Sequence, residues 1–193
     1  AHVDAGKTTL SEALLYTCGK IRTLGRVDHK NTYLDTNAVE RERGITIFSK
    51  QARFSSDECD FILLDTPGHV DFSAEAERVL SLLDYAILVI SGADGVQNHT
   101  KTLWSLLEFY RIPTFIFVNK CDIAIKTKDE QEEEICSLLS KDCVALFDTQ
   151  TKNELDEKLA LINEDFLDTH LNGEEIEDND IASLISERRL FPI

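Results

Sequence analysis

Short apolar runs alternate with amphipathic stretches along the chain. Four runs are β-prone, residues 45–54, 61–64, 86–90 and 114–118, and four stretches carry apolar side chains at helical spacing, residues 9–18, 73–83, 98–110 and 129–140. Continuous apolar runs are typical of parallel strands covered on both faces. The turn residues 55–57 between the first two runs predict an antiparallel hairpin. The pattern therefore predicts an α/β fold: a three-layer, mostly parallel sheet with an antiparallel edge hairpin and helices on both faces.

The acidic residues are concentrated late in the chain. The formal charge is −16, with 13 basic and 17 acidic residues in 1–122 but 7 and 19 in 123–193. We expect a single domain over residues 1–193 of this 193-residue chain, with a helical acidic insertion at 144–187 that forms two or three short helices. This charge argues against binding to nucleic acid through a cationic face, so no sequence-specific DNA partner is expected.

Cysteine usage and hydropathy indicate the cellular setting. The five cysteines have no C-x-x-C spacing, which favours a reducing cytoplasm over a disulfide framework or a zinc cluster. No apolar stretch approaches the roughly 20 residues that span a bilayer, so no membrane partner is expected. The chain opens on a loop motif that ordinarily follows a strand and stops on the apolar run 190–193. We therefore expect a monomeric piece of a longer protein, whose first strand precedes Ala1.

The first nine residues match a phosphate-loop motif, except that its first glycine is Ala1. Main-chain N–H groups in such a loop point at a diphosphate, and the following helix adds its positive end. Gly6 permits a close approach, Lys7 supplies a point charge, and the Thr8 hydroxyl suits Mg²⁺. The residues expected to hold the phosphates are His2, Val3, Asp4, Ala5, Gly6, Lys7, Thr8 and Thr9.

A second motif follows the apolar run 61–64. Asp65 stands at the carboxyl end of that predicted strand, where ligands of α/β sheets collect and where a carboxylate can support magnesium. Gly68 can offer its N–H to a terminal phosphate, and His69 comes next. A lone histidine is more often a satisfied core or surface residue than a catalyst, but this one directly follows Asp-Thr-Pro-Gly.

A third motif, Asn119-Lys120-Cys121-Asp122, stands at the carboxyl end of the run 114–118. A carboxylate can accept two hydrogen bonds from the N1–H and N2–H₂ of guanine, a pair that adenine lacks, so Asp122 favours GTP over ATP. A helix-capping Asp after a buried strand is the alternative. A phosphate-loop ATPase or kinase would have no need of this residue.

A fourth element lies between the first helix and the hairpin, in residues 41–47. Thr46 could reach the magnesium while the terminal phosphate is present and release it afterwards, which would make residues 20–46 a switch. An exposed charged turn followed by a strand threonine is the alternative.

Taken in order, the segments AHVDAGKTTLSEALLY, LGRVD, ERERGITI, DTPGHVDF, DGVQ and NKCD resemble the translational GTPases. Their amino-acid sequence is most similar to that of the tetracycline-resistance ribosomal-protection proteins, with elongation factor G next. The resemblance covers residues 1–122, nearly two thirds of the chain. The family tolerates alanine at the first position of the phosphate loop. Its last guanine-contacting loop is expected after Ile193, so we expect this chain to bind GDP more weakly than a chain extended through that loop.

The resemblance implies a role for each matching residue. Thr8 and Thr46 would ligate Mg²⁺, Asp65 would support the metal through water, and His69 would position the attacking water. Asp4 corresponds to a residue linked to a monovalent cation in some members. The residues that would hold guanine are Asn119, Lys120 and Asp122.

The resemblance also implies an activity. The chain would be a single GTP-binding and GTP-hydrolysing domain of a ribosome-associated translation factor, with GTP or GDP and Mg²⁺ as cofactors. GTP hydrolysis would be slow without the ribosome and would be stimulated by it. An elongation factor G-like translocase is the first alternative, and a GTP-dependent binding module with little hydrolysis is the second. The basic residues expected to face ribosomal RNA are Arg41, Arg43, Lys50 and Arg53.

Overall fold

The computed structural model describes residues 1–25, 50–56, 59–67, 73–146, 152–172 and 176–193. These residues form two compact units, 1–83 and 84–193, and each is considered by itself. Hydrogen bonding between the described strands gives three two-stranded sheets, β1–β2, β3–β4 and β5–β6. The residues expected in the site or at its RNA-facing side that lie outside the described ranges are Arg41, Arg43, Thr46, Gly68 and His69.

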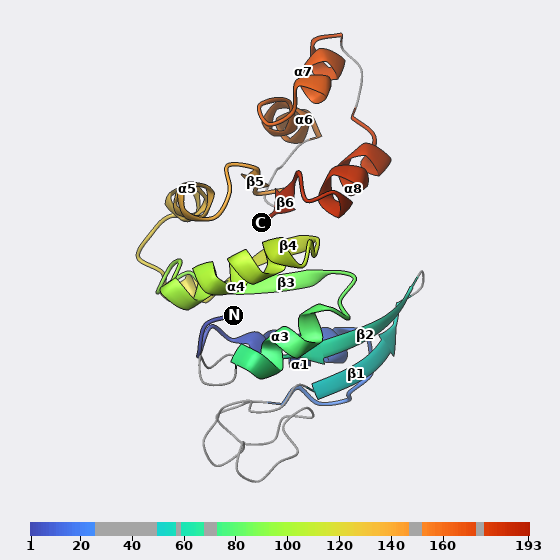
Figure 1. The fold of residues 1–193 in the computed structure, drawn as a ribbon, viewed down its shortest axis with the longest axis vertical. Helices are drawn as coiled ribbons and strands as arrows, with labels where there is room; N and C mark the ends of the chain where they lie inside the picture. Colours follow the sequence, from blue (N-terminus) through green and yellow to red (C-terminus); the bar gives the residue numbers. More distant parts are fainter. Residues whose placement is uncertain (26–49, 57–58, 68–72, 147–151, 173–175) are drawn as a thin grey trace. The chain divides into compact units, whose positions relative to one another are not determined.

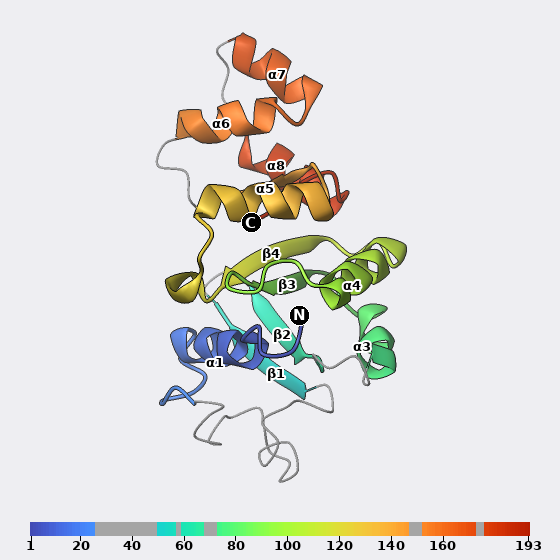
Figure 2. The ribbon, with the colours of Figure 1, turned by 90° about the vertical axis from the view of Figure 1, so that its left-hand side faces the viewer.

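The first unit packs helix α1 (Lys7–Thr17) against a hairpin of β1 (Lys50–Ser55) and β2 (Asp60–Asp65), and α3 (Ser73–Leu80) completes it (Figure 1). The strands pair antiparallel from Lys50↔Asp65 to Ser55↔Asp60, so the expected hairpin is confirmed. The views in Figures 1 and 2 place α1 beside the hairpin, and the contact is apolar. Its core side chains are Leu15 and Ala52, with Ile21, Phe54 and Leu63 packed around them.

Helix α1 ends where the sequence predicts. Gly19 has a φ of 68°, in the left-handed region that favours glycine. Its N–H donates to the Tyr16 carbonyl at 3.0 Å, and the N–H of Lys20 donates to the Leu15 carbonyl at 2.9 Å. These two bonds form a Schellman motif, which satisfies carbonyls at the end of the helix. The chain is thereby turned away from the helix axis after Cys18.

The second unit begins with the parallel pair β3 (Ala86–Ser91) and β4 (Thr114–Asn119), connected by helix α4 (Asn98–Phe109). Both strands and the helix were expected. Figure 1 shows α4 lying along this pair of strands. The buried apolar core here includes Leu88, Ile90, Trp104, Ile116 and Ile135. Two apolar runs therefore form a parallel pair of strands, as their sequence indicates.

After β4 come a short 3₁₀ helix, η2 (Cys121–Ile123), and helix α5 (Lys128–Leu138). Thr127 and Glu130 form a capping box: the Thr127 hydroxyl accepts the Glu130 N–H and the Glu130 carboxylate accepts the Thr127 N–H. This box fixes the start of α5. The expected apolar stripe is only partly confirmed, because Ile135 is 1% exposed whereas Leu138 is 41% exposed.

The acidic segment folds into β5 (Cys143–Val144), α6 (Lys152–Ala160), α7 (Glu164–Leu171), α8 (Asp178–Ser186) and β6 (Phe191–Pro192). Three short helices are at the upper end of the expected number. Their apolar side chains make a second core of the unit, which includes Leu159, Phe166, Ile176 and Leu190. The segment therefore has its own packed interior and is more than a charged cover.

The apolar run 190–193, expected to start a strand, forms β6. Its partner is β5, an earlier strand with which it pairs in parallel. The sequence gives no sign of β5, because two residues are too few to show a period.

All five cysteines are free. Of the helices in the described ranges, none has the length and apolar character needed to cross a bilayer.

Candidate nucleotide-binding site

The loop before α1 has the backbone of an anion site. Gly6 caps the helix with φ 92° and ψ 23°, and Asp4 also has a positive φ of 58°. Within the described part of the chain, no side chain caps the helix at Gly6, and its first turn contains no acidic residue. The positive end of the helix dipole therefore faces the loop, and no acidic side chain of the helix's own first turn offsets it. An anion such as a phosphate group suits this position.

Asp65 joins this loop to the end of β2. The Lys7 ammonium lies 2.9 Å from Asp65 Oδ1, and the Thr8 hydroxyl donates to Asp65 Oδ2 at 3.0 Å. The Asp65 residue is 2% exposed, whereas the Lys7 side chain keeps 17% of its surface in solvent. A strand end and a helix start, 57 residues apart in sequence, thus bring a cation, a hydroxyl and a carboxylate to one point.

These residues fit a magnesium ion. The Thr8 hydroxyl and the Asp65 carboxylate are hard oxygen donors that lie side by side. Mg²⁺ is usually held by one or two protein oxygens and completes its shell with phosphate oxygens and water. No cluster of three or more His, Cys, Asp or Glu side chains that could hold a metal occurs among the described residues. The Thr8 and Asp65 oxygens therefore suit an ion whose remaining ligands are phosphate oxygens and water.

The residues expected to contact a base occupy one loop of the second unit. Asn119 ends β4, and its carbonyl accepts the N–H of Gly92 at 2.7 Å. Lys120 follows with φ 59° and ψ 35°, a left-handed conformation, and Asp122 lies exposed in η2. The left-handed turn at Lys120 redirects the chain immediately after the strand. Asp122 is therefore presented to solvent at the carboxyl end of β4.

The structure thus brings Lys7, Thr8 and Asp65 together in one unit and groups Asn119, Lys120 and Asp122 in the other. The convergence of the two groups on one nucleotide stays a prediction. The roles of the remaining loop residues, His2, Val3, Ala5 and Thr9, also stay predictions.

Sequence reasoning missed two polar side chains of α5. Gln131 is 7% exposed, and its Nε2 donates to the Lys126 carbonyl at 3.2 Å. Glu134 pairs with the Lys126 ammonium at 2.9 Å. Gln131 and Glu134 are three residues apart, a spacing that places both side chains on one face of the helix. The helix contains four glutamates, so this spacing alone does not distinguish the two residues from their polar neighbours.

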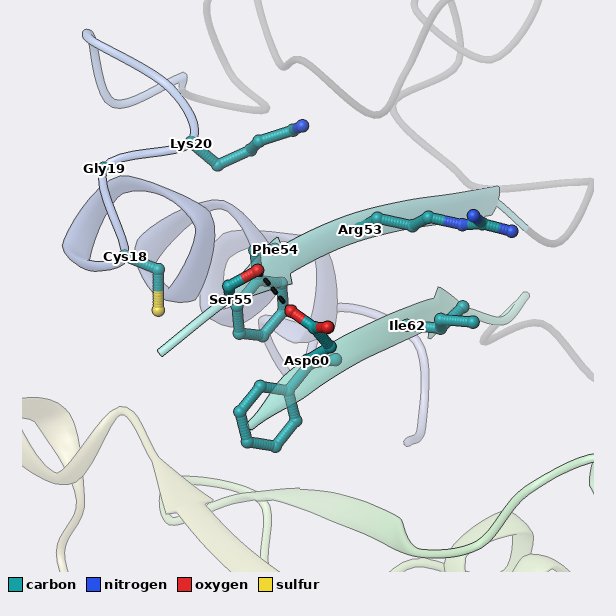
Figure 3. Close-up of a pocket in the computed structure, with 9 residues that line it drawn as sticks. Cys18, Gly19, Lys20, Arg53, Phe54, Ser55, Asp60 and Ile62 are labelled. Atoms are coloured by element: carbon teal, nitrogen blue, oxygen red, sulfur yellow. Dashed lines mark hydrogen bonds between the residues drawn. The ribbon is translucent and has the colours of Figure 1, made fainter. Parts of the chain in front are cut away.

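A cavity of about 570 Å³ lies elsewhere in the first unit (Figure 3). It is formed by the end of α1 at Cys18–Lys20 and by residues 53–55 and 60–62 of the hairpin. Phe54 and Phe61 stack there with ring centroids 5.1 Å apart, and the Ser55 hydroxyl donates to Asp60 at 2.5 Å, drawn as the dashed line in Figure 3. Because α1 is about 16 Å long and Lys7 begins it, this cavity is not the phosphate site.

Comparison with known proteins gives a family. The family model described as "Elongation factor Tu GTP binding domain" matches residues 1–183. The chain is 41% identical over 214 residues to a tetracycline resistance protein, TetP, of Clostridium perfringens, covering 100% of this chain and 33% of that protein. It is 51% identical over 122 residues to TetO of Campylobacter jejuni, covering 63% of this chain and 19% of that protein.

A solved structure from Thermus thermophilus is similar in fold. Its TM-score is 0.83 at 23% sequence identity, over 99% of this chain and 35% of that chain. At this identity the likeness concerns the fold alone. The chain spans about a third or less of the length of these tetracycline resistance proteins and of the solved chain.

Proposed function

This chain belongs to the family of elongation factor Tu GTP-binding domains, and from that membership we propose that it binds and hydrolyses GTP within a ribosome-associated translation factor of the tetracycline-resistance ribosomal-protection type. The observation that carries the proposal is the meeting of Lys7 and Thr8 at the buried carboxylate of Asp65. It supports phosphate and magnesium binding at the start of α1. The names of the relatives support the biological setting.

The proposed reaction is phosphoryl transfer to water, with no covalent intermediate. Positioning and charge stabilisation account for most of the catalysis in such reactions. Lys7 and the N–H groups of the loop would bind the phosphates, and Thr8, Thr46 and Asp65 would hold Mg²⁺. When bound, that ion neutralises charge on the phosphate oxygens. Gly68 would donate its N–H to the terminal phosphate.

His69 would orient the attacking water, and Asn119, Lys120 and Asp122 would select guanine. The ribosome would order His69 over the terminal phosphate, so hydrolysis in its absence would be slow. We also propose a monovalent cation near Asp4, a monomeric protein, and one GTP-binding domain with an acidic insertion at 144–187. A three-layer, mostly parallel sheet remains part of this proposal, and the likeness in fold supports it.

The first experiment compares nucleotides. In the full-length protein we expect GTP to bind at least about 100-fold more tightly than ATP, because adenine offers no paired donors to Asp122. Asp122→Asn should remove most of this preference. Equal affinity of the unmodified protein for GTP and ATP, measured by titration calorimetry, would contradict the guanine assignment and favour an ATPase or kinase.

The second experiment concerns hydrolysis. We expect slow GTP hydrolysis alone and strong stimulation by ribosomes, and His69→Ala should abolish the stimulation. His170→Ala, on α7, is the matched control and should keep it. A fully stimulated His69→Ala protein would refute the catalytic assignment. A protein that binds GTP but hydrolyses none in single-turnover assays with ribosomes would favour a binding module.

The third experiment separates the biological tasks. Purified full-length protein should restore translation in the presence of tetracycline. It should fail to support elongation in a translation system lacking elongation factor G. The reverse pattern would favour the translocase alternative.

A further inference from the structure

We propose that Gln131 is a positioning residue that sets guanine specificity, because it fixes the loop of residues 119–127 that carries Asp122. We call residues 119–127 the base loop. The inference rests on the proposed function and deepens it. Gln131 does not contact the nucleotide in this proposal, since its side chain is buried against the base loop and 7% exposed.

The upstream end of the base loop is tied to the strands. Asn119 is the last residue of β4 and pairs in register with Ser91 of β3. Its carbonyl also accepts the Gly92 N–H at 2.7 Å. Three features therefore fix this end: the strand, the register and a short backbone hydrogen bond.

The downstream end is tied to α5. Gln131 Nε2 donates to the Lys126 carbonyl at 3.2 Å, and Glu134 binds the Lys126 ammonium at 2.9 Å. The capping box between Thr127 and Glu130 then fixes the first turn of the helix. The bond from Gln131 to the main chain of the base loop is part-buried, whereas the bond from the Thr127 N–H to Glu130 is exposed.

The Gln131 amide also lies close to Gly92, whose N–H binds the upstream end of the base loop. A Cβ atom built on Gly92 would lie 3.1 Å from Gln131 Nε2 and 3.2 Å from the Asn119 carbonyl oxygen. The amide of Gln131 and the carbonyl of Asn119 therefore flank the same Cα atom. One side chain thus contacts the downstream end and lies beside the upstream end, so it sets the spacing between them.

Between these ends the base loop has local hydrogen bonds, such as that from the Ile123 N–H to the Lys120 carbonyl, but little apolar packing. Ile123 is 61% exposed and Ile125 is 98% exposed, so neither anchors the loop in a core. Asp122 lies in the exposed single turn η2. Because its neighbours are unpacked, the position of its carboxylate depends on the two ends of the loop.

Guanine recognition is sensitive to that position. Two carboxylate oxygens must meet two donors of the base edge, N1–H and N2–H₂, at the same time. Hypoxanthine, the base of inosine diphosphate (IDP), keeps N1–H and lacks the N2 amine. A shifted Asp122 would lose the second bond first. The affinity ratio of GDP to IDP therefore reports on the position of Asp122, whereas a general loss of stability lowers both affinities together.

The test uses the full-length protein and measures dissociation constants for GDP and IDP by titration calorimetry. Gln131→Leu keeps the volume and removes the donor to Lys126. Gly92→Ala presses on the same contact from the other side, because its new Cβ would be crowded by the Gln131 amide. The matched control is Glu133→Gln, at an exposed position of the same helix.

We expect the GDP preference over IDP to fall about 3- to 10-fold in both variants, the range that loss of one hydrogen bond produces. The control should keep the preference of the unmodified protein. The melting temperature of each variant, measured in parallel, should lie above the temperature of the titration, which shows that the variant is folded there. If Gln131→Leu does not fold, Gln131→Met, which also removes the donor to Lys126, decides.

Two results would overturn the inference: an unchanged preference, or an equal loss of affinity for both nucleotides. An unmodified protein that shows no preference for GDP over IDP would instead contradict the proposed function itself. The two failures are therefore distinguishable in one set of titrations.

Discussion

The ion pair between Lys7 and Asp65 offers a direct test of how the phosphate site is held together. Asp65 is 2% exposed and accepts one bond from the Lys7 ammonium and one from the Thr8 hydroxyl. Lys7→Met removes the cation that lies 2.9 Å from the buried carboxylate and keeps the bond from the Thr8 hydroxyl. Asp65→Asn removes the charge but keeps an oxygen that can accept a hydrogen bond. The two changes therefore have unequal costs.

Burial sets the magnitudes. Removing one partner of a buried pair costs about 3–5 kcal/mol, because the other charge is left uncompensated. The Lys7 side chain keeps 17% of its surface in water, which screens the pair and places Lys7→Met at about 2–4 kcal/mol. Asp65→Asn should cost about 1–2 kcal/mol, because the freed ammonium can turn to solvent. The double variant should cost about 1–2 kcal/mol less than the sum of the two.

Urea unfolding of the nucleotide-free chain, followed by circular dichroism, measures all four free energies in one double-mutant cycle. The m-values should agree, so that the shifts report stability. Thr8→Val is the control for loss of one hydrogen bond and should cost about 1–3 kcal/mol. If the costs of Lys7→Met and Asp65→Asn add to within about 0.5 kcal/mol, the pair does not stabilise the site and the reasoning is refuted.

Three further predictions concern the second unit. Burial, with a smaller contribution from Cys136, raises the pKa of the Cys143 thiol from 9.0 to about 12. The unfolded chain therefore deprotonates first, and stability should fall by about 1.4 kcal/mol per pH unit between 9 and 12, a slope that Cys143→Ala should reduce in urea titrations at several pH values. Arg188→Ala should cost about 1–2 kcal/mol and change the fluorescence of Trp104, whose ring centre lies 5.5 Å from the guanidinium; an unchanged spectrum would contradict that contact. Gly95→Ala should cost at least about 1 kcal/mol in thermal unfolding, because φ is 68° and the new Cβ would lie 2.7 Å from the Glu134 carboxylate; an unchanged melting temperature would contradict it.

Local chemistry explains what the sequence could predict. Gly19 ends α1 because a left-handed residue is needed there, and a glycine after a helical pattern is a direct sign of one. The runs that became β3 and β4 are continuous and apolar, so their parallel pairing could be expected. The burial that such runs indicate is only partly confirmed, because Ile87 is 48% exposed and Phe117 is 41% exposed. The loop motif and a carboxylate at the end of a strand placed Lys7 and Asp65 in one predicted phosphate and magnesium site, whereas the direct ion pair between them was not predicted.

Long-range contacts explain what it could not. The strand β5 is two residues long and pairs with a segment 48 positions later, as in Cys143↔Phe191, which no local pattern indicates. The contact of Gln131 with the base loop depends on a glycine far from it in sequence, Gly92. The expectations for Thr46, Gly68 and His69 concern residues outside the described ranges and remain predictions.

The contact at the end of β2 also bears on how the proposed nucleotide would enter. The Lys7 ammonium offsets the charge of the buried Asp65 carboxylate, so this charge does not require a metal ion to be compensated. When a magnesium nucleotide is bound, Lys7 would bind the phosphates, and Thr8 and Asp65 would help to hold the ion. The Lys7 ammonium already offsets the Asp65 charge without a nucleotide, so the contact between the end of β2 and the start of α1 should be formed before the nucleotide binds.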